Sequence, residues 1–285
     1  MAHIIIIGSG PAGVSAALYT ARAGVNTTII SKGSGALVMA DRIENYYGFA
    51  EPVSGQALEE AGEEGAKRLG VEIVEEEVVG LSFDNGFTVE TNQGTYHADS
   101  IILAAGASRH TPSILGLKEL EGKGVSYCAV CDAFFYRNKE VAVLGSGEYA
   151  LHEAMELVSV VKSVTILTNG QKLQVALPEK IKVIEKEIAQ INGKDRVAGV
   201  SFLDGSEIET DGIFVAYGIA GSVELARKIG AITEQNRIVT NEAKATNVPG
   251  LFAAGDCTGG LYQISKAVYE GAEAGTQAIR FLRKQ

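Results

Sequence analysis

The sequence predicts an α/β protein made of two Rossmann-like domains, the second inserted into the first. Short apolar runs alternate with segments of helical periodicity, which is typical of helices layered on parallel sheets. A glycine-rich loop follows the first apolar run at 8–13, and a similar loop follows a similar run at 145–150. The chain therefore contains the same strand–loop–helix unit twice.

The first unit begins with a strand and a helix. Residues 3–8 form a continuous apolar run, as expected of a buried parallel strand. Apolar residues then recur at helical spacing over 14–21, and Gly24 stands where the end of a helix favours glycine. We expect Val25–Ser31 to be the second strand and 58–69 to be the second helix.

The remaining segments of the first unit and the segments of the second unit are expected in a similar order along the chain. Alternation between Val78 and Tyr96 predicts a hairpin with its turn at Asp84-Asn85-Gly86, and 100–104 predicts a buried strand. The segments expected in the second unit are a strand at 140–144, a helix at 150–160, a strand at 164–167, an alternating stretch at 197–208 and a strand at 213–217. Each unit is thus expected to build its own sheet.

The tail from about Asn241 starts no third unit. It contains an apolar strand, an Ala254-Gly255-Asp256 turn and an Ala/Gly-rich helix from Ser265 onward. A tail without its own core must complete an earlier one, most simply the first. We therefore predict a discontinuous domain of residues 1–112 and 243–285 and an inserted domain of residues 113–242.

Composition excludes several classes of function. The 285 residues are 46% hydrophobic, enough for a large core, and the net charge of −10 argues against nucleic-acid and membrane-surface binding. No apolar run approaches the roughly 20 residues that span a bilayer. The start carries no targeting signal, and three cysteines do not make a secreted disulfide framework, so we expect a cytoplasmic protein.

The first glycine-rich loop, Gly8-Ser9-Gly10-Pro11-Ala12-Gly13, predicts a phosphate site. In this motif the first glycine permits a tight turn, the second lets the backbone approach a pyrophosphate, and the third lets helix and strand pack closely. Its place between a strand and a helix favours a ligand over an ordinary turn. The second strand ends in Ser31 and Lys32, where an acidic residue usually holds a ribose, so the adenosine contacts must differ.

The second loop, Gly145-Ser146-Gly147-Glu148-Tyr149-Ala150, is altered. Glu148 and Tyr149 bring a charge and a bulky ring to the place beside a bound pyrophosphate. The following strand ends in Thr168-Asn169-Gly170, without an acid for an NADH ribose or an arginine for the NADPH phosphate, and Lys172 is the nearest cation. We favour a nucleotide fold kept as a scaffold over a working nicotinamide site.

Cys128-Ala129-Val130-Cys131-Asp132 predicts redox chemistry. Two cysteines separated by two residues can close a small disulfide, and Asp132 beside them can shuttle protons. A zinc site is disfavoured because Cys257 is the one other cysteine and the histidines at 3, 97, 110 and 152 are scattered. Two inert buried cysteines are the other alternative, and we expect Cys257 to be a small core residue.

These motifs together resemble the low-molecular-weight thioredoxin reductases over nearly the whole chain. The resemblance rests on Ile7–Gly13, Ile43–Gly48, Ala104–Ser108, Cys128–Asp132 with Phe134–Arg137, and Leu251–Asp256. It implies a homodimer of FAD/NAD(P)-binding folds with FAD in the discontinuous domain. It also implies that the inserted domain rotates, so that the dithiol meets first the flavin and then the partner.

The resemblance also implies roles for individual residues. Asp256 would hydrogen-bond the ribityl chain of FAD, Asn45 would lie near the flavin, and Gln263 would reach its edge. Cys131 would be the flavin-proximal thiol, Cys128 would attack the partner disulfide, and Asp132 would act as the acid–base. The expected cofactor contacts are Gly8, Gly10, Pro11, Ala12, Gly13, Ser31, Lys32, Asn45, Ala105, Gly106, Gly255, Asp256, Gln263 and Ile264.

Departures from the family pattern predict the electron donor. Members that use NADPH carry a basic cluster where this chain has Thr168–Lys172, and small residues in place of Glu148 and Tyr149. Because it lacks the basic cluster and the small loop residues, the chain resembles the ferredoxin-dependent flavin thioredoxin reductases. A flavin can accept single electrons and pass on a pair. We therefore expect electrons to pass from ferredoxin through FAD and the Cys128/Cys131 dithiol to thioredoxin.

Three alternatives stay open at this point. The first is a reductase that uses NADPH or NADH through an atypical pocket. The second is a flavin dithiol oxidase that passes electrons to oxygen, and the third is a redox sensor without turnover. Ferredoxins are acidic and so is this chain, so ferredoxin docking would need a local basic patch.

Overall fold

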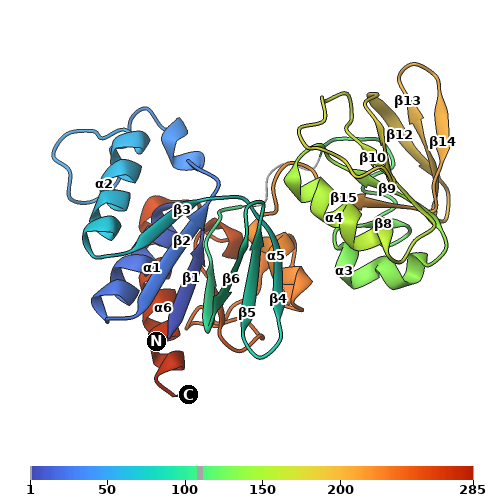
Figure 1. The fold of residues 1–285 in the computed structure, drawn as a ribbon. Coiled ribbons are helices and arrows are strands. Elements are labelled where there is room, and N and C mark those ends of the chain that lie inside the picture. Colours follow the sequence, from blue (N-terminus) through green and yellow to red (C-terminus); the bar gives the residue numbers. More distant parts are fainter. Residues whose placement is uncertain (1, 108–111, 285) are drawn as a thin grey trace. The chain divides into compact units, whose positions relative to one another are not determined.

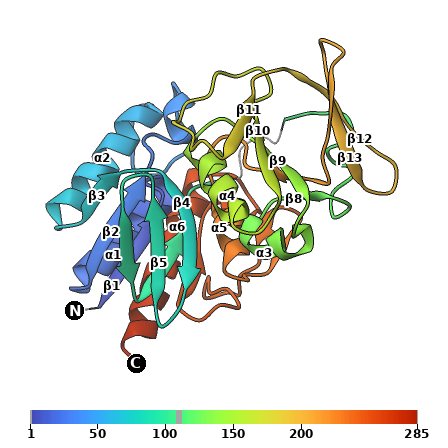
Figure 2. The ribbon, with the colours of Figure 1, turned by 45° about the vertical axis from the view of Figure 1, so that its right-hand side comes forward.

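The computed structural model describes residues 2–107 and 112–284. The chain forms two compact units, which are Met1–Ser108 together with Gly221–Gln285, and Arg109–Ala220 (Figure 1, Figure 2). The chain therefore leaves the first unit, builds the second and returns to complete the first.

The first unit is built on a five-stranded parallel sheet with the strand order β18-β7-β1-β2-β3. Its strands are β1 (His3–Ile7), β2 (Asn26–Ser31), β3 (Glu72–Glu75), β7 (Ser100–Leu103) and β18 (Leu251–Ala253). Successive β1 residues Ile4, Ile5 and Ile6 are all 0% exposed, so both faces of the sheet are covered. β18 comes from the tail and pairs in parallel with β7, so the tail completes this sheet.

The three longer helices of the first unit share one apolar core with one face of this sheet. They are α1 (Pro11–Arg22), α2 (Gly55–Arg68) and α6 (Ile264–Leu282). The backbones of α1 and α6 approach each other closely at Gly271. A Cβ at this position would lie 2.0 Å from the carbonyl oxygen of Ala12. A second, antiparallel sheet contains β4 (Val78–Phe83), β5 (Phe87–Thr91) and β6 (Thr95–Ala98). The shorter elements are η1 (Ala36–Met39), α5 (Ser222–Lys228), β16 (Thr233–Glu234), β17 (Arg237–Ile238) and η3 (Asp256–Thr258).

The second unit repeats this plan. Its parallel sheet has the order β11-β10-β9-β15-β8, and its antiparallel sheet the order β12-β13-β14. The parallel strands are β8 (Val125–Ser126), β9 (Glu140–Leu144), β10 (Ser163–Leu167), β11 (Ile181–Ile184) and β15 (Gly212–Val215). The other elements are α3 (Ala129–Asp132), η2 (Ala133–Tyr136), α4 (Glu148–Val158), β12 (Ile188–Gly193), β13 (Val197–Phe202) and β14 (Glu207–Glu209). A core that includes Leu144, Leu167 and Ile213 joins the two sheets.

The predicted fold class is confirmed, but the second predicted boundary is misplaced. The units separate at Ala220/Gly221, whereas the sequence placed the return at 242/243. Residues 221–242 belong to the first unit because α5 packs against β4, and β17 packs against η3. The first predicted boundary, 112/113, adjoins residues 108–111, which lie outside the described residues. His110 is one of these four residues.

Candidate functional site

The first glycine loop has the geometry of a close turn between β1 and α1. Gly8 has a φ of +112°, and a Cβ there would lie 2.5 Å from the carbonyl oxygen of Ala104. A Cβ at Gly13 would lie 1.9 Å from the carbonyl oxygen of Gly8. Both positions therefore require glycine on steric grounds.

The middle of this loop is open. A Cβ at Gly10 would meet no heavy atom of the described chain within 4 Å. Gly10 is also the N-cap of α1 and has no side chain to satisfy the helix, while Pro11 begins the first turn. The helix N-terminus therefore presents free backbone N–H groups and the positive end of its dipole, as a pyrophosphate requires.

The end of β2 is held by local polar contacts. Ser9 Oγ donates to Ser31 Oγ at 3.2 Å, and Ser31 Oγ donates to the carbonyl oxygen of Gly33 at 3.0 Å. Lys32 forms an ion pair with the buried Glu77, which follows β3. Sequence reasoning missed Glu77 because it lies 45 residues further along the chain. The parallel pairing of β2 with β3 brings it there.

Two side chains that we expect to contact the flavin form a hydrogen bond with each other, although they lie far apart in the sequence. The amide of Asn45 donates to Gln263 Oε1 at 3.0 Å, although 218 residues separate them. A pair of backbone hydrogen bonds between Ile43 and Val53 holds the segment that carries Asn45. Gln263 is the N-cap of α6, and Ile264 is the first residue of that helix.

The remaining expected contacts lie where β7 and β18 end. Ala105 N donates to Ser222 Oγ at 2.9 Å, and Gly106 follows with a φ of +77°. At the end of β18, a Cβ on Gly255 would lie 2.9 Å from Cβ of Ala12, so this turn lies beside the glycine loop. Burial raises the pKa of the neighbouring Asp256 carboxyl above its usual value, although Lys266 counteracts it. The carboxyl ends of parallel strands are where Rossmann folds bind their ligands.

The second unit carries the redox pair. Cys128 and Cys131 form a disulfide, with 5.3 Å between their Cα atoms. Cys131 is exposed, whereas Cys128 is buried at 5% exposure. One residue of the pair is therefore open to solvent and the other is enclosed.

Polar side chains fix the short helix α3 that contains the disulfide. Ser126 Oγ donates to the carboxylate of Asp132 at 2.6 Å and accepts from Cys128 N at 3.2 Å. The carboxylate of Glu153, on α4, accepts from Ala129 N at 2.7 Å. Glu153 is 1% exposed and was not singled out from the sequence. A search for a capping motif at the start of α3 would not have found Glu153, because this acceptor lies on a different helix.

The second glycine loop is closed by side chains of its own unit. Ser146 Oγ donates to Gln171 Oε1 at 2.7 Å, and Gln171 Nε2 donates to the hydroxyl of Tyr217 at 2.7 Å. Gln174 N donates to the carbonyl oxygen of Ser146 at 2.9 Å. The segment after β10 thus lies across the loop between β9 and α4. Tyr149 is 1% exposed, four residues before Glu153 on the face of α4 that meets α3.

Known proteins provide an independent comparison. The model of the pyridine nucleotide-disulphide oxidoreductase family matches residues 2–271. A thioredoxin reductase from Listeria innocua is 37% identical over 303 residues, covering 99% of this chain and 94% of the relative. The chain belongs to the thioredoxin reductase family.

Two solved thioredoxin reductases extend the similarity to the fold. An atypical thioredoxin reductase from Desulfovibrio vulgaris Hildenborough has a TM-score of 0.95 and 39% identity, with 100% of this chain and 99% of that chain covered. A ferredoxin-flavin thioredoxin reductase from Clostridium acetobutylicum has a TM-score of 0.73 and 31% identity, with 99% and 98% covered.

FAD is the cofactor of this family, and the first unit of this thioredoxin reductase fits it. Gly10 and the uncapped start of α1 suit a pyrophosphate, and the Gly255–Asp256 turn lies beside them. The Asn45–Gln263 pair lies at the start of α6. When bound, FAD supplies the capacity to accept single electrons and deliver a pair.

Candidate metal ligands, the third cysteine and the apolar helices are the remaining features of this thioredoxin reductase. Within 2–107 and 112–284, His, Cys, Asp and Glu side chains form no group of three or more that could hold a metal ion. Cys257 is buried, and burial raises its pKa to about 12. It is a small core residue, as predicted. No helix in the described part of the chain is long and apolar enough to cross a membrane.

Proposed function

We propose that the protein is a flavin-dependent thioredoxin reductase that takes electrons from ferredoxin and does not use a pyridine nucleotide. The observation that supports this donor is the closed second loop. Gln171 joins Ser146 to Tyr217 at the carboxyl ends of β9 and β15, where a nucleotide would have to lie. Similarity to the ferredoxin-flavin enzyme of Clostridium acetobutylicum also supports the proposal.

The proposed reaction ends on the dithiol. Two electrons and two protons convert the Cys128–Cys131 disulfide into two thiols. Cys128, as thiolate, attacks one sulfur of the thioredoxin disulfide and forms a mixed disulfide, and Asp132 protonates the sulfur that leaves. Cys131 then attacks Cys128, which releases reduced thioredoxin and restores the disulfide.

The burial of the two cysteines supports this division of roles. Cys131 is the exposed residue of the pair, and in our proposal its sulfur is the one that the reduced flavin reaches. Cys128 is enclosed while the disulfide is closed. In our proposal it becomes accessible to thioredoxin when the bond opens.

A trapping experiment tests these roles. We expect a Cys131→Ser variant to form a stable mixed disulfide through Cys128 with a thioredoxin that lacks its resolving cysteine. The matched Cys128→Ser variant should trap much less, and mass spectrometry of the linked peptides would identify the bond. A trap formed only by Cys128→Ser would reverse the assignment.

The electron donor is tested by an anaerobic titration. We expect the flavin absorbance to be lost only with chemically reduced ferredoxin, followed by reduction of thioredoxin. Rapid loss with NADPH or NADH would contradict the proposal. A Gln171→Ala variant, in which the bridge to Ser146 and Tyr217 is absent, shows whether the closed loop is what excludes the nucleotide. Oxygen uptake with a small dithiol would instead support a dithiol oxidase.

A further inference from the structure

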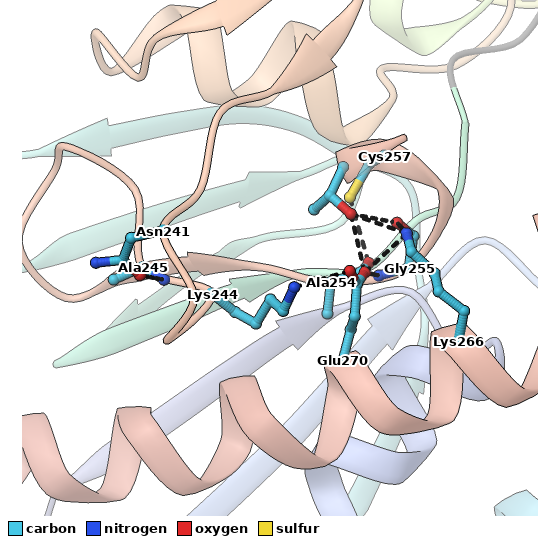
Figure 3. Close-up of polar contacts among 9 residues, drawn as sticks. Asn241, Lys244, Ala245, Ala254, Gly255, Cys257, Lys266 and Glu270 are labelled. Carbon is cyan, nitrogen blue, oxygen red and sulfur yellow. Dashed lines mark hydrogen bonds and ion pairs between the residues drawn. The ribbon is translucent and has the colours of Figure 1, made fainter. Parts of the chain in front are cut away.

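Three charged side chains lie together around the Gly255 turn of the first unit (Figure 3). Glu270 on α6 binds Lys266 of the same helix at 2.8 Å and Lys244, which precedes β18, at 2.9 Å. The side chains of Lys244 and Lys266 are 16% and 15% exposed. Charges removed from water are costly unless they are paired and hydrogen-bonded. Two positive charges share a single carboxylate here, so packing alone does not explain the cluster.

Lys266, Glu270 and Thr258 hold the two polar backbone groups of Gly255, and Thr258 donates to the Gly255 carbonyl oxygen from its backbone N at 3.0 Å and from Oγ1 at 2.8 Å. Gly255 N donates to Glu270 Oε2 at 2.9 Å, and Lys266 Nζ donates to the carbonyl oxygen of Gly255 at 2.7 Å. Lys266 Nζ also donates to Thr258 Oγ1 at 2.9 Å. With Glu270, these acceptors satisfy all three protons of the ammonium group. Burial raises the pKa of Glu270, but the hydrogen bonds from Lys266, Lys244, Thr258 and Gly255 outweigh it and leave the pKa lowered.

Lys244 has different neighbours from Lys266, and its ammonium group lies over the ring of Tyr269, 6.0 Å from the ring centroid. Its ammonium group donates to the other carboxylate oxygen, Glu270 Oε1, at 2.9 Å. In the described contacts it reaches Gly255 only through Glu270. The two lysines therefore share a carboxylate and a degree of burial, but of the two only Lys266 donates directly to Gly255 in the described contacts.

The position of Gly255 affects the cofactor site. Its φ of +83° is left-handed, and a Cβ there would lie 2.9 Å from Cβ of Ala12 in the glycine loop. Asp256 follows directly and begins η3. A shift of the Gly255 backbone would therefore move Asp256 relative to the phosphate loop.

We infer that Lys266 is a positioning residue for FAD, because it helps to fix the Gly255 backbone and so the place of Asp256, the residue that would hydrogen-bond the ribityl chain. This inference rests on the FAD-binding part of the proposed function and is independent of the electron donor. It assigns to Lys266 an effect on cofactor affinity that Lys244 does not share.

The test compares Lys266→Met with Lys244→Met. FAD affinity is measured by fluorescence during titration of the FAD-free protein, and thermal unfolding is measured without FAD. We expect Lys266→Met to bind FAD about ten-fold more weakly, since it loses charge-assisted hydrogen bonds to the turn. Lys244→Met should lose similar thermal stability but keep its FAD affinity within about three-fold. The visible circular dichroism of bound FAD should change in Lys266→Met alone.

Other results of this comparison would overturn either the inference or the proposed function. Equal weakening of FAD binding in both variants would overturn the inference, because the cluster would then only support the fold. If the unaltered protein bound no FAD, the proposed function itself would fail. If Lys266→Met did not fold, Thr258→Val would replace it. This variant keeps every charge and removes one acceptor of Lys266 together with the hydrogen bonds of the Thr258 hydroxyl to Gly255 and Glu270. Unchanged FAD affinity in Thr258→Val would also overturn the inference.

Discussion

Three cysteines show how burial and bonding set the chemistry of one residue type. Cys131 is exposed and Cys128 is enclosed, and a disulfide joins them. Cys257 is buried, and its Sγ lies 3.3 Å from the carbonyl oxygen of Ala254. Cys257 is not suited to exchange electrons with a partner in the folded protein, because a thiol must reach its partner and become a thiolate to react.

The raised pKa of Cys257 leads to a labelling prediction. Burial raises its pKa to about 12, so it stays a protonated thiol at pH 8. We expect iodoacetamide at pH 8 to modify two thiols in the reduced native protein and all three after unfolding, counted by mass spectrometry. Rapid modification of Cys257 in the native protein would contradict its burial.

The same pKa shift fixes the sign of a stability effect. The folded protein favours the protonated thiol, so the contribution of Cys257 to stability is fully present below the ordinary pKa of 9.0. It is lost as the pH rises from there toward about 12. Unfolding by urea at a series of pH values measures this trend.

At the scale of elements, the redox helix depends on its neighbours. α3 contains four residues, too few to be stable alone. It packs against α4, and Glu153 of α4 accepts one of its first N–H groups. The glycine loop before α4 therefore still has a structural use, because it places the helix that supports the disulfide.

Removing this acceptor should destabilise the second unit. We expect Glu153→Ala to cost about 1–3 kcal/mol, because it leaves the buried N–H of Ala129 without its acceptor. Glu153→Gln keeps an amide oxygen and should cost less. Urea unfolding measures both variants, with Glu156→Ala as an exposed control on the same helix.

The rate of disulfide reduction separates support of α3 from a general loss of stability. A small phosphine should reduce the Cys128–Cys131 disulfide faster in Glu153→Ala than in Glu156→Ala, because α3 is held less firmly. Equal stability and equal reduction rates in these two variants would show that Glu153 does not support α3.

At the scale of the whole molecule, two units of similar plan serve different purposes. Both α1 and α4 begin at a glycine without a side-chain cap, but in the second unit Gln171 joins Ser146 of the loop to Tyr217. One unit therefore presents a cofactor site and the other presents a disulfide. If ferredoxin is the donor, as we propose, the net charge of −10 requires an acidic ferredoxin to dock on a local cluster of Lys and Arg side chains.

The sequence by itself determined the fold class, the duplicated unit, the redox pair and the family. These depend on local patterns: apolar runs, glycine spacing and the Cys-x-x-Cys motif are each read within a few residues. The expectation that Cys257 lies in the core is of the same kind, since it follows from the residue type and its isolation.

Only the tertiary structure decided how distant residues meet. It placed Glu77 against Lys32, Asn45 against Gln263, and Lys244 and Lys266 around Glu270. It also moved the second domain boundary to Ala220/Gly221, because residues 221–242 pack on the first unit. No local pattern encodes these contacts. Strand order and helix packing bring together segments that are far apart in the chain, and sequence spacing does not report those distances.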